Sequence, residues 1–251
     1  MKQKRPFLGP VMLGAGTLGV VLSAPGQTAG VSAFTDFLIA DLGIGRSALS
    51  LAYLLGTLSS AALLSIAGRL YDRFGARVTA AASALSLSAV LLMLAASPGI
   101  LELLGALFPR ASADIVGPAM ITLLFFLLRF SGQGMLTLSS RNMVMEWYQR
   151  RRGAANAVMG ISVAFAYSLT PGAFTLLIRT AGGWQAAWRL SAFVLALFAG
   201  FAAVVYRWKP EAVGQLPDGG PGPGSDGYSQ ERSGADHGFT LAEARRTWAF
   251  W

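Results

Sequence analysis

The sequence contains no cysteine, so the chain can form neither a disulfide bond nor a reactive thiolate. It has one histidine, His237, which lies in a stretch rich in glycine and proline. Histidine clusters that bind metals and Ser-His-Asp triads both need histidine, so these chemistries are excluded from within this chain. We therefore expect no metal site and no cofactor.

Charged residues are scarce as well. They make up 13% of the chain, whereas hydrophobic residues make up 54%. A soluble domain usually has about twice that charged fraction, and this balance is typical of a membrane protein. The net charge of +8 would suggest a nucleic-acid partner if it lay on one soluble face. Here Lys and Arg fall between apolar segments, so we expect a lipid bilayer and no nucleic acid.

Six apolar segments approach the roughly 20 residues that a spanning helix needs. They cover residues 7–34, 47–67, 78–97, 117–139, 154–178 and 185–206. Strands are disfavoured because the runs are long and do not alternate, and helices satisfy their own backbone hydrogen bonds in lipid. The first segment could also be a secretory signal peptide, but five further segments follow it and its apolar run continues past Pro25. We favour an uncleaved first helix.

The basic residues predict the orientation of these segments. Most of the 20 Lys and Arg residues fall on one side, where both chain ends also lie. The exceptions are Arg46, Arg110, Arg179 and Arg189 on the other side, and Arg129 within a segment. Because basic loops stay in the cytoplasm, we expect a multi-pass protein of the cell (inner or plasma) membrane with both termini cytoplasmic.

Composition also divides the chain. We expect residues 1–208 to form a six-helix transmembrane bundle. Residues 209–240 are polar and rich in Gly, Pro and Ser, which predicts a flexible cytoplasmic linker. Residues 241–251 are basic and then aromatic, like the cytoplasmic entrance to a further span. We interpret them as the start of a second bundle that is missing.

Several polar residues stand inside or beside apolar runs. Arg129 is costly there, so it either faces a cavity, a partner or a substrate, or is a structural arginine bonded to backbone carbonyls. Gln133 follows it within the same segment. Pro25 can interrupt the first segment, after which Gln27 and Thr28 could bond a small polar substrate, although ordinary helix packing explains them equally well.

Two basic stretches lie on the predicted cytoplasmic side. Arg150, Arg151 and Arg152 precede the fifth segment and are expected to anchor its end. The stretch "GRLYDRFGARV", residues 68–78, lies between the second and third segments and is expected to be a cytoplasmic loop. Its single acid, Asp72, contributes little to topology, so it favours a specific pairing over an incidental charge.

This stretch resembles the loop motif of the major facilitator superfamily, G-x-L-a-D-r-x-G-r-[RK], between its second and third helices. The matching residues are Gly68, Leu70, Asp72, Arg73, Gly75 and Arg77. Tyr71 and Ala76 depart from the motif at tolerant positions. The position after the second segment on the basic side agrees with the family as well.

Two further patterns resemble one branch of that family. "RFSGQG" at Arg129 and "PGQTAGVSAF" at Pro25 look like the oxalate/formate antiporters, and "EWYQRRRGAANAVMG" looks like the monocarboxylate-transporter signature. In that signature Tyr148 replaces a Phe, and Asn156 stands near an expected Gly.

The resemblance implies an all-α membrane protein: six transmembrane helices, arranged as two inverted three-helix repeats, that form one half of a major-facilitator fold. It implies the N-terminal half of a secondary active transporter of small organic anions such as mono- or dicarboxylates, working by alternating access with proton coupling or by exchange. Asp72 and its neighbours would form a conformational latch against the second bundle, and Arg129, Gln133, Gln27 and Thr28 would line the path. The expected partners are the anion, protons, and a second six-helix half or a second copy of the chain.

Two other classes remain open. A truncated or regulatory membrane protein that does not transport, and acts only with a partner half, would show the same six segments. A membrane-embedded enzyme would need paired carboxylates, histidine or a serine dyad inside the segments, and the sequence shows none there. We therefore expect no enzymatic activity.

Overall fold

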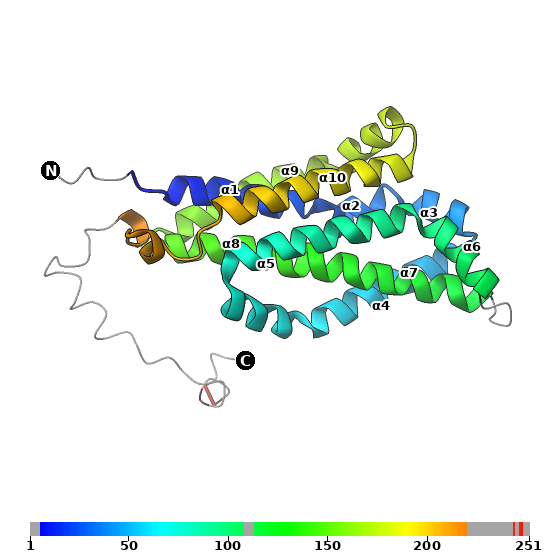
Figure 1. Ribbon diagram of the computed structural model, residues 1–251, viewed down its shortest axis with the longest axis horizontal. Helices are drawn as coiled ribbons and strands as arrows, with labels where there is room; N and C mark the ends of the chain where they lie inside the picture. Colours follow the sequence, from blue (N-terminus) through cyan, green and yellow to red (C-terminus); the bar gives the residue numbers. More distant parts are fainter. Residues whose placement is uncertain (1–5, 108–112, 220–242, 244–245, 248–251) are drawn as a thin grey trace, which may run out of the picture.

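The computed structural model describes residues 6–107, 113–219, 243 and 246–247 and consists mainly of long apolar helices. Within those ranges every regular element is a helix. The long helices lie side by side along one axis and form an elongated bundle (Figure 1). The all-helical class expected from the sequence is confirmed.

The first apolar segment is broken rather than continuous. It consists of α1 (Gly9–Leu22), a 3-10 turn η1 (Ala24–Gly26) and α2 (Thr28–Ser32), and α3 (Thr35–Leu42) follows it. Gln27, between η1 and α2, has an extended backbone. The break follows from Pro25, which has no N–H to donate and cannot continue a helix without loss. The interruption at Pro25 that the sequence allows is therefore present in the first segment.

The chain then turns sharply at two glycines, Gly43 and Gly75. The helices α3 and α4 (Arg46–Ala62) meet at an angle of 116°, across a left-handed Gly43 with φ 63°. After Leu63 the chain enters α5 (Leu64–Ala95), which contains the whole stretch 68–78 expected as a loop and consists of two helices that meet at Gly75. Only Gly75, with φ 74° and ψ 171°, leaves the helical conformation. The expected loop is therefore shorter than predicted: it is reduced to a turn at Gly75, and the residues on either side continue the two flanking helices.

The remaining helices complete the bundle. They are α6 (Ser97–Leu107), α7 (Ala113–Arg129), a π-helical segment η2 (Phe130–Leu136), α8 (Thr137–Trp147), α9 (Arg152–Thr180) and α10 (Trp184–Val205). Two short 3-10 turns follow, η3 (Pro210–Val213) and η4 (Pro217–Gly219). The end of α10 and these turns return to the end of the bundle where α1 begins (Figure 1).

Four of the described helices are long and apolar enough to cross a membrane. They are Leu64–Ala95, Ile115–Trp147, Arg152–Thr180 and Trp184–Val205, and the bent pair α3–α4 supplies a fifth if it is one span. The first expected segment is not among them because its break leaves only short helices.

Packing pairs the segments in a regular way. The first segment packs against the fourth through α1 and α8, and the third packs against the sixth through α5 and α10. The second segment also packs against the fourth, through α4 and α7. Large apolar side chains cover the outer surface; Phe165, Leu169 and Val204 are each more than two-thirds exposed, as suits a lipid-facing surface. The helix α9 is the least embedded, with 22% of its apolar window buried against 50% for α5.

Candidate functional site

Two irregular backbone segments touch in the middle of the bundle. They are the 3-10 turn η1 and the π-helical segment η2. A β-carbon on Gly26 would lie 2.8 Å from the Cα of Gly132, and one on Gly132 would lie 2.9 Å from the Cα of Gly26. Such an approach is open only to glycine. Helix breaks at membrane depth are tolerated where they are buried in protein or line a cavity, and π-helical turns are frequent at functional sites.

A cluster of polar side chains surrounds this contact, and we call it the central polar cluster (Ser23, Gln27, Thr137 and Tyr167). The fully buried hydroxyl of Ser23 lies 3.0 Å from that of Thr137 and 2.9 Å from that of Tyr167. The amide of Gln27 donates to Ser23 Oγ at 3.1 Å. Ser23 and Tyr167 both also donate to the carbonyl of Val20, at 2.7 and 2.8 Å. Each hydroxyl of the cluster has one hydrogen to donate, but Ser23 and Tyr167 each have more than one acceptor within reach. The hydroxyl hydrogens can therefore be oriented in more than one way.

Arg129 lies beside the cluster as the last residue of α7, and its side chain is buried, with 6% exposed. Its Nη1 donates to the carbonyl of Gly26 at 3.2 Å and to Thr28 Oγ1 at 3.5 Å. The guanidinium also lies over the ring of Tyr53, 5.3 Å from the centroid. Its buried Nε has no hydrogen-bond partner, and no carboxylate of the described residues lies within salt-bridge distance. The arginine charge is therefore only partly compensated.

A half-open cavity of about 210 Å³ is lined in part by Thr28 and Tyr53, the two side chains that contact this arginine. It is lined by Thr28, Val31, Ser32, Thr35, Leu49, Ser50, Tyr53 and Phe125. Thr28 and Tyr53 share a hydrogen bond of 2.8 Å between their hydroxyls, and both contact Arg129, so they connect the cavity to the cation. The lining carries several hydroxyl groups and no carboxylate.

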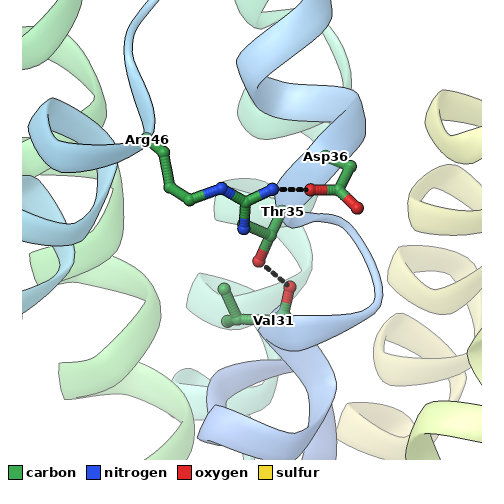
Figure 2. Close-up of polar contacts among 4 residues, drawn as sticks. All are labelled: Val31, Thr35, Asp36 and Arg46. Carbon is green, nitrogen blue, oxygen red and sulfur yellow. Dashed lines mark hydrogen bonds and ion pairs between the residues drawn. The ribbon is translucent and has the colours of Figure 1, made fainter.

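An exposed ion pair marks one edge of the cavity. Figure 2 shows Arg46, at the start of α4, reaching across to Asp36 in α3. Thr35, which lines the cavity, lies beside the pair, and its hydroxyl donates to the carbonyl of Val31. The two charged side chains are 70% and 80% exposed, so this pair contributes little stability.

The sequence profile of the Major Facilitator Superfamily matches residues 16–251. The chain belongs to this superfamily. No curated protein and no solved structure gives a significant match. Members of the major facilitator superfamily are multi-pass membrane proteins that transport small solutes, and the superfamily is not one of enzymes.

The stretch 68–78 in α5, which resembles the superfamily motif, has some residues packed against the end of α10 and others exposed. Gly75 packs under the indole of Trp208, since a β-carbon there would lie 2.7 Å from the ring, and Arg77 Nε donates to the carbonyl of Tyr206 at 3.4 Å. These two residues therefore bind the end of α10 within the same bundle. Asp72 and Arg73 are exposed, and so is Arg77 apart from this hydrogen bond. A β-carbon on Gly68 would meet no atom within 4 Å, so no close helix approach occurs there among the described residues.

The basic stretch before α9 forms an exposed turn. Arg152 Nε donates to the carbonyls of Met145 and Tyr148, at 3.3 and 3.1 Å, which closes the turn between α8 and α9. Arg150 and Arg151 bond Asp218 through their backbone N–H groups. Burial, and then the nearby Asp218 carboxylate, raises the pKa of Tyr148.

The structure brings together three of the four residues predicted to line the path. Gln27, Thr28 and Arg129 surround the contact between η1 and η2. Gln133 belongs to η2, but its side chain is exposed. Sequence reasoning missed Ser23, Tyr53, Thr137 and Tyr167. The tyrosines carried a weak signal, because each places a hydroxyl inside an apolar run where it must find a partner.

Proposed function

We propose that this chain is the N-terminal six-helix half of a secondary active transporter of small organic anions such as mono- or dicarboxylates. Transport would proceed by alternating access, with proton coupling or by exchange. The observation that carries the proposal is Arg129, a buried cation with an unpartnered Nε beside a cavity. A buried arginine can bind a carboxylate through two parallel hydrogen bonds, which gives both affinity and orientation.

The cavity lining favours an anion over a cation. Hydroxyl groups such as those of Thr28, Ser32 and Ser50 can donate hydrogen bonds to a carboxylate, and the lining includes no acid that would repel it. The volume of about 210 Å³ suits a small solute. The apolar walls, Leu49 and Phe125 among them, would exclude water around the bound charge.

A partner completes the proposed transporter. We propose a second six-helix half or a second copy of the chain, with residues 209–240 as the connection and 241–251 as the start of the next bundle. The low burial of α9 supports a partner on that side. The second candidate function, a regulatory membrane protein that acts only with a partner half, rests on the same observation. We also propose the cell membrane as its location, with both termini cytoplasmic.

The test of the anion site is binding and uptake of labelled oxalate, formate, lactate and pyruvate by the purified chain in proteoliposomes, with and without a pH gradient. Arg129→Ala should weaken anion binding at least about tenfold, because one charge-assisted pair is lost. Arg129→Lys should retain part of the affinity as a point charge. Arg179→Ala, which removes an exposed arginine from α9, is the matched control and should bind normally.

The outcomes separate the candidates. Binding without uptake by the chain alone would favour action with a partner half. Full binding by the Arg129→Ala protein at normal expression would assign the arginine a structural role. No binding of any of the four anions would contradict the organic-anion assignment.

A latch at Asp72 is the remaining part of the proposal. Asp72 and Arg73 are exposed on α5 and are available to a second bundle, whereas Gly75 and Arg77 are used internally. Asp72→Asn should slow transport by the complete assembly more than it lowers expression, because the closed state loses a charged contact. Glu102→Gln, which removes an exposed acid from α6, is the control. An unchanged transport rate would remove the latch.

A further inference from the structure

Asp218 is bonded to a part of the chain far from it in sequence. Its Oδ2 accepts hydrogen bonds from the backbone N–H groups of Gln149 and Arg150, at 2.9 and 2.7 Å. Its Oδ1 accepts one from the N–H of Arg151 at 3.3 Å. The N–H of Arg151 is one of the donors that α9 leaves unpaired at its start, and those of Gln149 and Arg150 belong to the turn that leads into it. A carboxylate here satisfies these donors and complements the helix dipole. Asp218 therefore caps α9 from outside the helix.

The segment that carries Asp218 is fixed at other points, and we call residues 209–219 the strap. Gln215 bonds the start of α1 on both sides: its Oε1 accepts from the N–H of Leu8 at 3.0 Å, and its Nε2 donates to the carbonyl of Pro6 at 2.7 Å. Leu216 and Pro217 are buried. The strap crosses the end of the bundle between α1 and α8 (Figure 1). These residues begin the stretch that was expected to be a linker, and here they are packed.

The backbone of Asp218 is strained. Its φ is 58°, and it is the one non-glycine residue with positive φ in the described part of the chain. Left-handed backbone costs roughly 1–2 kcal/mol for a residue with a β-carbon and persists only where the surroundings hold it. Here the three N–H bonds hold it on one side, and Gly219 lies against the ring of Phe7 on the other.

The helix that Asp218 caps is also the one least held by packing. Only 22% of the apolar window of α9 is buried. In its middle, Tyr167 donates to the carbonyl of Val20 and contacts Ser23, so α9 forms one wall of the central polar cluster. A displacement of α9 would separate Tyr167 from Ser23. Because a rigid helix moves as one body, a tilt at the start of α9 would also displace Tyr167 from Ser23.

We propose that Asp218 is a positioning residue. Through the strap, it clamps the start of α9 so that Tyr167 closes the central polar cluster, and release of the clamp lets α9 move away. The strap is then a conformational device that couples one end of the bundle to the site around Arg129. Only its effect on transport rests on the proposed function; the clamp itself is a property of this chain and is tested without substrate.

The test is a distance measurement between two spin labels in the full chain in proteoliposomes. Because the chain has no native cysteine, labels attach only at introduced ones. Asn156→Cys on α9 and Arg69→Cys on α5 are both exposed and make no contact used in the proposal. With Asp218 intact, we expect one dominant distance. With Asp218→Asn, a second distance should become populated, with a roughly tenfold rise in its ratio to the first, the size expected for a lost helix cap.

Two further variants complete the test. Glu102→Gln removes an exposed acid at a different place in the bundle and should leave the distances unchanged. Asp218→Glu keeps the charge but displaces the carboxylate, and should give a smaller shift in the same direction, which keeps the test decisive if Asp218→Asn fails to fold. An unchanged distance distribution in folded Asp218→Asn, or in Asp218→Glu if the former is not folded, overturns the clamp. Arg129→Ala that loses anion binding but keeps the single distance would show that the clamp is independent of the anion site. Asp218→Asn that gains the second distance but still binds anions would show the same, so the inference and the proposed transport function fail separately.

Discussion

At the scale of single residues, the site depends on one unusual cation and two unusual glycines. Arg129 keeps a charge inside the bundle by donating to the carbonyl of Gly26 and lying over Tyr53. The carbonyl is within reach only because Gly26 and Gly132 let the two backbones meet. The arginine and the glycines therefore form one structural unit.

Gly26→Ala tests this contact. The new methyl group would lie 2.8 Å from the Cα of Gly132 and 2.9 Å from the carbonyl oxygen of Leu128, so backbone must shift. We expect destabilisation of about 1–3 kcal/mol, the usual cost of overpacking. Thermal unfolding in detergent, followed by tryptophan fluorescence, measures it. Gly160→Ala is the control, because its β-carbon would meet nothing within 4 Å. Equal stability of the two variants would contradict the close contact.

Residue type explains which site residues the sequence could reveal. Arg129, Gln27 and Thr28 were predicted because polar groups in apolar runs need partners. Ser23 and Thr137 were missed because serine and threonine can always bond a carbonyl of their own helix, so their presence signals nothing. Gln133 has the right type in the right segment, yet its side chain is exposed and makes none of the hydrogen bonds described for the cluster. Side-chain direction in a π-helical turn does not follow the ordinary helical period.

At the scale of elements, the breaks matter more than the helices. Helix type and approximate limits followed from long apolar runs, and the turn expected within 68–78 is present but confined to Gly75. The charged residues of this stretch are helical, and the two helices that make up α5 meet at Gly75. The break is filled by Trp208, which no local pattern near Gly75 could have predicted.

Gly75→Ala should therefore be costly for two separate reasons. The positive φ of 74° costs a residue with a β-carbon about 1–2 kcal/mol, and the methyl group would lie 2.7 Å from the indole of Trp208. We expect a loss of about 2 kcal/mol or more in the free energy of unfolding. Gly68→Ala, with open space around it, should change stability little. In a protein that already carries Trp208→Ala, Gly75→Ala should cost less, because the clash is gone and only the backbone strain is left. If Gly75→Ala costs nothing in that background, the strain is contradicted.

At the scale of the whole molecule, the bundle has two different ends. One end carries the Asp36–Arg46 pair and the α3–α4 bend. The other carries the start of α1, the strap and the arginine-rich turn before α9 (Figure 1). The distribution of Lys and Arg predicts that this second end faces the cytoplasm.

Single cysteines test that orientation without background, since the chain has none of its own. Ser47→Cys and Gln149→Cys place exposed thiols at the two ends. In intact cells, a maleimide that cannot cross membranes should label Ser47→Cys, and should label Gln149→Cys only after permeabilisation. The opposite pattern would reverse the topology and leave the fold unaffected.

The number of residues in the π-helical segment between α7 and α8 determines which way the residues of α8 face. A π-helix holds more residues per turn than an α-helix, so Phe130–Leu136 takes up chain that a regular helix would use to turn further. Removing a single residue there could restore a regular helix, and each residue of an α-helix turns the chain by about 100°. Thr137 and Ser140, which follow the deletion, would then be rotated relative to Arg129, which precedes it, and would face different neighbours. In this part of the chain, the number of residues specifies the site as strictly as their identity does.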